Sequence, residues 1–204
     1  SDMPQLTQSL TSASKCRFSH LHLEADVNDW VNWGMSEGNI DPNVIAFIRY
    51  RPELLFDFDK DSVAWASPRT WESVSDITKA DQKGIVQNSQ DQALIGGTVG
   101  EGTATEFCAF MGMVNTLPDV SEILKNPKGY EISDDPSVLY ALTGALARRA
   151  DANNFADVIT YMTRDEMSKE FAVICVSDAV TVSPKLAKTK AYIDFMSEYK
   201  DIMS

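Results

Sequence analysis

Apolar residues recur every three to four positions along most of this sequence, the spacing that places side chains on one face of an α-helix. Near the start of the chain this pattern predicts two helices, over 27–38 and 42–50. Each is preceded by an aspartate, Asp26 or Asp41, whose carboxylate can cap the free N–H groups of the first turn. Pro52 ends the second helix, because the residue before a proline is disfavoured in the helical conformation.

A third helix is predicted to begin at Ser67-Pro68, where a capping side chain is followed by a proline whose fixed φ suits the first turn. Trp71, Val74 and Ile77 then lie on one face of that helix. The same spacing predicts further helices over 101–114, from Asp135-Pro136 onward, and over 155–162, 171–180 and 193–203. In total the pattern predicts about seven to nine short helices.

One segment, 17–24, alternates with the two-residue period of a β-strand. No other part of the chain sustains a sheet pattern, so the sequence predicts an all-α fold with at most one short N-terminal strand. We expect a tail over 1–25, a helical domain over 26–125 and a C-terminal helical extension over 126–204. Asparagine, proline, glycine and aspartate gather in the segment 126–135, which makes it the best candidate for the boundary between the two helical parts.

The composition is that of a globular protein, with 204 residues, 44% of them hydrophobic and 24% charged. A net charge of −12 argues against a general nucleic-acid surface, which needs concentrated lysine and arginine. No stretch approaches the roughly 18 apolar residues of a membrane span, and no signal sequence precedes the first structured segment, so we expect a cytoplasmic protein without a membrane partner. The four tryptophans stand at spacings that suit core packing: Trp30, Trp33, Trp65 and Trp71.

The cysteines Cys16, Cys108 and Cys175 are widely spaced in apolar surroundings. This pattern predicts buried free thiols in a reducing compartment rather than a disulfide framework. His20 and His22 share one face of the predicted strand, but no carboxylate or thiol pattern accompanies them, so we expect no metal site.

The glycine-rich run 96–103 has part of the spacing of a phosphate-binding loop, because Gly97 and Gly102 stand where the first and last glycines of GxxxxGK[ST] would be. Thr103 occupies the place of the lysine that would reach the β and γ phosphates. No hydrophobic strand precedes the run. We therefore interpret it as a helix boundary or a close approach between helices.

The start of the third helix is a candidate anion site. Ser67 and Pro68 begin the helix, and Arg69 then projects from its first turn, at the positive end of the helix dipole. A cation is unfavourable there unless an anion binds beside it, and a helix N-terminus with an arginine can bind a phosphate. The alternative is that Arg69 forms an ion pair with a nearby acidic residue, and the residues alone leave this open: Asp57, Asp59 or Asp61.

Four short motifs follow one another within the first part of the chain. They are Arg17-Phe18, then Trp30 with Trp33, then Ala46-Phe47 with Arg49, Arg51, Pro52, Leu54 and Leu55, then Ser67-Pro68-Arg69 with Trp71. Together they resemble the carboxy-terminal half of bacterial and phage ATPases of the MoxR branch of AAA+ proteins. Residues 100–107 and the Leu117-Pro118 step also look like that family. The resemblance is strong over 17–125 and weak after it.

This resemblance implies an AAA+ lid-type helical bundle over 26–125, preceded by the end of the ATPase core. Arg69 would then be the sensor-2 arginine, which reaches the γ-phosphate of bound ATP, with Ser67 beside it in the nucleotide site. Arg17 falls near the place of an arginine finger that reaches the neighbouring subunit's nucleotide, although Cys16 replaces the asparagine or aspartate that usually precedes it. From the residues alone, Arg17 is a solvated residue at a strand edge.

The family's Walker A lysine and Walker B acidic pair are not present in these residues, so we expect a fragment that shows no ATPase activity alone. ATP, with Mg²⁺, is the cofactor implied for the parent protein, and no tightly bound cofactor is expected here. The implied partners are the chain's own ATPase core, neighbouring subunits of a homo-oligomer that is commonly hexameric, and a protein with a von Willebrand A domain. The work would be ATP-driven remodelling or chaperone-like assembly. The alternative is a freestanding helical adaptor that binds protein through an acidic surface.

Overall fold

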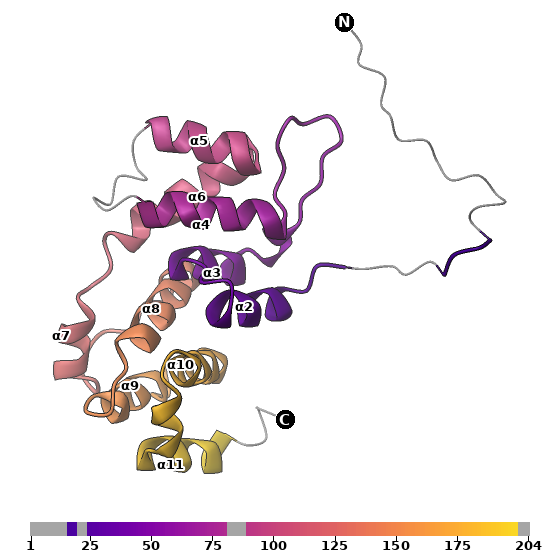
Figure 1. Cartoon of the computed structure of the whole chain (residues 1–204). Coiled ribbons are helices and arrows are strands. Elements are labelled where there is room, and N and C mark those ends of the chain that lie inside the picture. The colour runs from indigo at the N-terminus through magenta and orange to yellow at the C-terminus, as the bar shows by residue number, and fades with distance from the viewer. Residues whose placement is uncertain (1–15, 20–23, 81–88, 200–204) are drawn as a thin grey trace, which may run out of the picture.

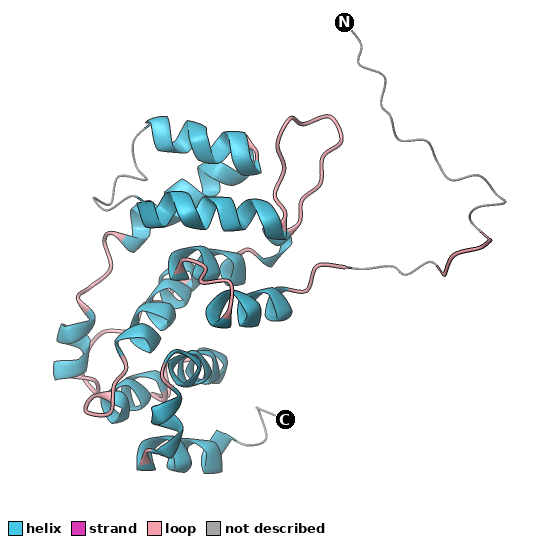
Figure 2. Cartoon of the chain, in the orientation of Figure 1, coloured by secondary structure: helices cyan, strands magenta, loops and turns pink. Residues whose placement is uncertain are grey.

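The structure, a computed structural model, describes residues 16–19, 24–80 and 89–199. Within these ranges the fold is all helical, as predicted (Figure 2). The β pairing there is limited to a single bridge between Asp57 and Ala66. Residues 16–19 and 24 belong to no strand, and the rest of the strand predicted over 17–24 lies outside the described residues. None of the described helices is both long and apolar enough to cross a bilayer.

The helices follow one another through short connections, with two longer loops (Figure 1). In chain order they are α2 (Val27–Ser36), α3 (Pro42–Tyr50), the 3-10 helix η1 (Pro52–Leu55), α4 (Pro68–Ala80), α5 (Ser89–Val99), α6 (Glu101–Val114), α7 (Val120–Lys125), α8 (Pro136–Arg149), α9 (Phe155–Met162), α10 (Lys169–Val182), the 3-10 helix η2 (Pro184–Lys188) and α11 (Lys190–Tyr199). The predicted helices are confirmed within a few residues, except that the end of the helix predicted over 193–203 lies outside the described residues. The sequence did not predict α5, α7 or the two 3-10 helices, η1 and η2.

Aspartate caps fix the start of several helices. Asp26, Asp41 and Asp135 accept hydrogen bonds from backbone N–H groups two or three residues further on, at 2.8 to 2.9 Å. Each bond satisfies a donor that has no partner within the helix. These caps explain why the starts of α2, α3 and α8 lie where the sequence predicted them.

The glycine-rich run forms the corner between α5 and α6. Gly100 has a φ of 92°, in the left-handed region that favours glycine, and a β-carbon at this position would lie 3.2 Å from the carbonyl oxygen of Ala64. Gly96 and Gly97 lie inside α5, where glycine weakens a helix. The helix-boundary interpretation of the run is confirmed.

The first hydrophobic core lies between α2, α3, α4, α5 and α6. Its centre is a group of three fully buried rings, Phe47, Trp71 and Phe107, whose centroids are 5.2 to 5.6 Å apart. The indole Nε1 of Trp71 donates a 2.8 Å hydrogen bond to the carbonyl oxygen of Leu54 in η1. This bond anchors α4 to the end of η1. Trp65 does not join this core, contrary to the sequence expectation, because 37% of its surface is exposed.

The second core lies between α7, α8, α9, α10 and α11, with Leu146, Phe155, Tyr161 and Leu186 among its most buried side chains. The two cores meet along α8, since Ala141 packs in the first core and the next residue in the second. Figure 1 shows the helices of the second core stacked below those of the first. α7 packs in the second core although its residues precede the boundary predicted at 126. The division into domains stays a prediction.

We expect Trp71→Ala to lower the free energy of unfolding by about 3–5 kcal/mol, because it removes a buried ring and leaves the Leu54 carbonyl without its donor. The control is Trp65→Ala, whose expected cost is about 1 kcal/mol or less because its ring is partly exposed. Urea unfolding followed by circular dichroism measures both. Equal losses in the two variants would show that Trp71 does not anchor this core.

Candidate functional site

Two side chains lock the first turn of α4 by bonding reciprocally. The N–H of Ser67 donates to the Oγ1 of Thr70 at 2.8 Å, and the N–H of Thr70 donates to the Oγ of Ser67 at 3.2 Å. This is a capping box with threonine in the place of glutamate. The predicted cap at Ser67 is therefore present, and it fixes the direction in which the next residues of the turn project.

Arg69 lies in this first turn, exposed to solvent. Among the described residues it forms no ion pair, with Asp57, Asp59, Asp61 or any other acidic side chain. The backbone N–H of Asp57 bonds to Ala66, and the carboxylate of Asp59 accepts a hydrogen bond from the N–H of Asp61 at 2.9 Å. The local ion pair that the sequence left open as an alternative is not observed.

The two other arginines of this region are neutralised by carboxylates. Arg49 bonds to Asp178, and Arg51 pairs with Glu53 at 2.6 Å and also with Glu106. The hydrogen bond from Arg51 lowers the pKa of Glu53. Of these three arginines, Arg69 alone forms no ion pair within the described part of the chain.

The electrostatics of the α4 N-terminus suit an anion. The first turn of α4 carries no acidic residue, and the helix is 13 residues long, so its dipole is not offset at this end. A bound phosphate could be contacted there by a guanidinium and by the positive end of the helix. The described residues contain no group of three side chains suited to hold a metal ion. The site can therefore contact a phosphate group, but it lacks the lysine and metal ligands of a complete nucleotide site.

Arg17 does not lie beside Arg69. It is exposed in a turn of the segment 16–19, which Figure 1 shows away from the start of α4. The chain by itself does not bring Arg17 and Arg69 into one site. His20 and His22 lie outside the described residues.

None of the three cysteines, all of which lie in the described part of the chain, forms a disulfide, but they are not all buried. Cys175 is fully buried, and burial raises the pKa of its thiol far above the usual range. Burial also raises the pKa of Cys108, which is partly exposed. Cys16 is exposed, so the expectation of a buried thiol was wrong for this residue, because it lies in a turn of the exposed segment 16–19.

Sequence reasoning missed the pairing of Arg49 in α3 with Asp178 in α10, 129 residues away. The bond is bidentate, at 2.5 and 2.8 Å, and Asp178 is only 5% exposed. A pair of this kind is geometrically specific and leaves a buried charge if either partner is lost. The signal in the sequence was a single aspartate within the apolar run 171–182.

A pocket of about 290 Å³ opens beside this ion pair, between α3, α4, α8 and α10. Lys79 and Arg148 line it, each in the last turn of its helix. Cations at that position stabilise the negative end of the helix dipole. Their presence is explained by the helices themselves and does not require an anionic ligand in the pocket.

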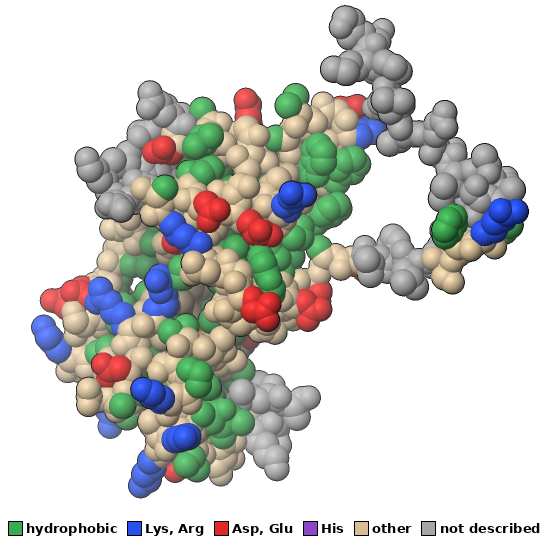
Figure 3. All heavy atoms as spheres, viewed as in Figure 1, with side chains coloured by type: hydrophobic (Ala, Val, Ile, Leu, Met, Phe, Trp, Pro, Cys, Tyr) green, Lys and Arg blue, Asp and Glu red, His purple; other side chains and the backbone are tan. Residues whose placement is uncertain are grey.

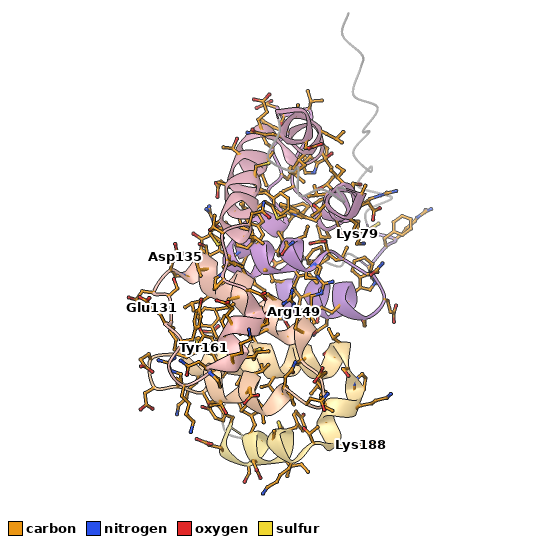
Figure 4. The ribbon with its side chains drawn as sticks, turned by 90° about the vertical axis from the view of Figure 1, so that its left-hand side faces the viewer. Lys79, Glu131, Asp135, Arg149, Tyr161 and Lys188 are labelled. Atoms are coloured by element: carbon orange, nitrogen blue, oxygen red, sulfur yellow. The ribbon has the colours of Figure 1, made fainter. Side chains whose placement is uncertain are left out.

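The arginines on the face of the second core also have intramolecular partners. Figure 4 shows Arg149 on this face, and it pairs with the carboxylate of Asp119 at 2.9 Å. Arg164 donates to the carbonyl oxygen of Tyr130 and pairs with Glu166 at 3.1 Å. Arg149 and Arg164 therefore both have their charge paired within the chain.

Comparison with known proteins gives no assignment: no family model, no curated protein and no solved structure matches the chain. Any function is therefore inferred from the residues and their geometry, together with the motifs of residues 17–125.

A double-mutant cycle tests whether Arg49 and Asp178 act as a pair. We expect Arg49→Met to lower the free energy of unfolding by about 3–5 kcal/mol, because it leaves the Asp178 carboxylate buried without a partner. The double variant Arg49→Met with Asp178→Leu should recover most of this loss, since no buried charge remains. Urea unfolding measures the cycle, and additive losses would contradict a direct pairing.

Proposed function

We propose that this chain is the nucleotide-sensing helical part of a MoxR-like AAA+ ATPase, in which Arg69 contacts the γ-phosphate of ATP held by the ATPase core. The observation that carries the proposal is an exposed arginine without an acidic partner among the described residues, in the capped first turn of α4. A cation at that end of a helix is stabilised when an anion binds to it. The motif Ser67-Pro68-Arg69 with Trp71 is the part of the family resemblance that coincides with this geometry.

The chemistry of phosphoryl transfer gives such an arginine its role. Negative charge spreads over the transferred phosphoryl group in the transition state, and fixed cations stabilise it without further reorganisation. The reciprocal bonds between Ser67 and Thr70 hold the turn from which Arg69 projects. The packing of Trp71 holds the same turn from the inside of the molecule.

The remaining parts of an ATP site must come from the ATPase core. Thr103 stands where a phosphate loop would carry lysine, and the corner at Gly100 is a helix boundary. In this proposal the core supplies the Walker A lysine and the ligands of Mg²⁺, and residues 1–204 alone do not hydrolyse ATP. Arg17 would serve the nucleotide of a neighbouring subunit in a homo-oligomer of the hexameric kind. A protein with a von Willebrand A domain would be the partner in remodelling.

A freestanding helical adaptor is the second candidate function. It is favoured by a loop over residues 56–66 that exposes several apolar side chains beside acidic ones. The coding sequence on the amino-terminal side of residue 1 distinguishes the two candidates. A GxxxxGK[ST] loop between a strand and a helix would support the ATPase, and a stop codon directly before Met3 would support the adaptor.

In an ATPase polypeptide that contains these residues, we expect Arg69→Ala to lower kcat for ATP hydrolysis by about 10²–10³-fold, the loss typical of removing one group that stabilises transition-state charge. Arg69→Lys should recover part of the rate, because lysine keeps the charge without the planar fork. The matched control is Arg148→Ala, an exposed arginine in the last turn of α8. Hydrolysis at the wild-type rate in Arg69→Ala would refute the proposal.

A further inference from the structure

Residues 56–66, here called the aromatic loop, connect η1 to α4. Figure 1 shows the loop projecting beside α4 and α5. Its base is closed by the bridge between Asp57 and Ala66, in which the N–H of Asp57 donates to the carbonyl oxygen of Ala66 at 3.0 Å. Ala66 itself is buried. The loop is therefore tied to the body of the molecule at its base while its outer part stands in solvent.

The loop exposes large apolar side chains. Phe56 and Phe58 are each 56% exposed, Trp65 is 37% exposed and Val63 is fully exposed. Four of the eight large apolar side chains that stand exposed among the described residues belong to these 11 positions, 56–66. Figure 3 shows hydrophobic side chains gathered over this part of the molecule. Scattered single apolar residues need no explanation, but such a concentration marks an interaction surface.

Internal contacts give the loop a defined shape. The rings of Phe58 and Trp65 meet edge to face with centroids 5.1 Å apart, directly beyond the bridge. At the tip, the Asp59 carboxylate accepts the N–H of Asp61, and the Oγ of Ser62 donates to the carbonyl oxygen of Ala64 at 2.7 Å. Aromatic side chains held in this way lose little conformational entropy when a partner covers them.

A hollow of about 710 Å³ lies between the tip of the loop and the corner of α5 and α6. Val63 and Asp61 line it from the loop, and Glu101 from the start of α6. The opposite wall is formed by small residues of α5, including Ala93, Gly96 and Gly97. The hollow offers room for a side chain of a bound partner beside the exposed Val63 at the tip of the loop.

The charge around the aromatic loop selects the partner. Asp57, Asp59 and Asp61 are exposed on the loop and Glu101 faces the hollow beside it, so the acidic side chains outnumber the two exposed cations, Lys60 on the loop and Arg69 in the first turn of α4. A basic segment is attracted to this field, whereas nucleic acid, anionic lipid and acidic peptides are repelled. The apolar side chains require apolar anchors on the same segment.

We propose that the aromatic loop docks a basic, amphipathic segment of a partner protein, with apolar side chains against Phe58 and Trp65 and lysine or arginine side chains toward the loop aspartates. This inference does not depend on nucleotide recognition, because it concerns other side chains and a peptide ligand. The two proposals can fail independently, because docking by the loop is measured by peptide binding and nucleotide recognition by ATP hydrolysis.

Isothermal titration calorimetry with three 14-residue peptides tests the proposal on the whole chain. The first peptide carries leucine at helical spacing with lysine between, the second replaces lysine by glutamate, and the third replaces leucine by serine. We expect only the lysine–leucine peptide to bind, and its affinity to fall as salt is raised. Phe58→Ser with Trp65→Ser should weaken binding at least about tenfold, as expected on removing aromatic anchors. Asp57, Asp59 and Asp61 changed together to asparagine should reduce the salt dependence.

The matched control is Ile193→Ser on α11, which removes an apolar side chain that is 59% exposed but far along the chain from the loop. It should leave binding within about twofold of the wild type. Unchanged far-UV circular dichroism would show that each variant is folded. Equal weakening by Ile193→Ser, equal binding of the glutamate peptide, or full binding by the loop variant would overturn the proposal. So would a dimer of the wild-type chain that becomes monomeric in the loop variant, because a second copy would then occupy the surface.

Discussion

The hydrogen bond from the indole of Trp71 to the carbonyl oxygen of Leu54 sets the geometry on which the functional part of the molecule depends. It fixes the first turns of α4 against the end of η1, with the Trp71 ring packed between Phe47 and Phe107. Two consequences follow from one contact. Arg69, two residues earlier in the helix, is exposed on a turn that this bond anchors to the core, and the aromatic loop between Leu54 and Trp71 is held at both ends. Recognition at either place therefore uses a pre-organised surface, which lowers the entropic cost of binding.

The two hydrophobic cores are joined by a shared helix and by an ion pair. α8 contributes side chains to both, and the ion pair between Arg49 and Asp178 connects α3 with α10 across the boundary. A buried pair of this kind adds little net stability compared with apolar side chains, but the wrong arrangement of the two halves would leave two charges buried without partners. We interpret the pair as a device that fixes the position of the second core on the first. In the proposed ATPase, the first core, which carries Arg69, and the helices of the second core would then move together as one body when nucleotide binds.

The sequence predicted those features that depend on neighbouring residues. Aspartate caps and prolines placed the starts of α2, α3, α4 and α8, and the Ser67 cap with Arg69 was found from the same local pattern. α5 was missed because Gly96 and Gly97 lie inside it, and α7 because six residues are too few to show a period. The sequence did not predict features that depend on contacts between residues far apart in the chain. Nothing near Arg49 identifies Asp178 as its partner, and Trp65 was expected in the core from the spacing of the tryptophans, which does not show that it stands on a projecting loop. That Arg69 lacks an acidic partner among the described residues could be seen only from the folded chain.

Phosphate recognition by Arg69 is tested most directly by following the backbone amide signals of residues 1–204 by NMR while ATP is added. The interaction should be weak, with a dissociation constant above about 1 mM, because a charge-assisted hydrogen bond contributes about 1.5–3 kcal/mol and a 1 mM complex needs about 4.1 kcal/mol. The amide signals of Ser67, Arg69 and Thr70 should shift first, and Arg69→Ala should abolish these shifts while Arg148→Ala leaves them in place. Shifts centred on the glycine-rich corner at residues 96–103, or shifts at α4 that persist in Arg69→Ala, would contradict the assignment of Arg69 as the nucleotide-sensing residue.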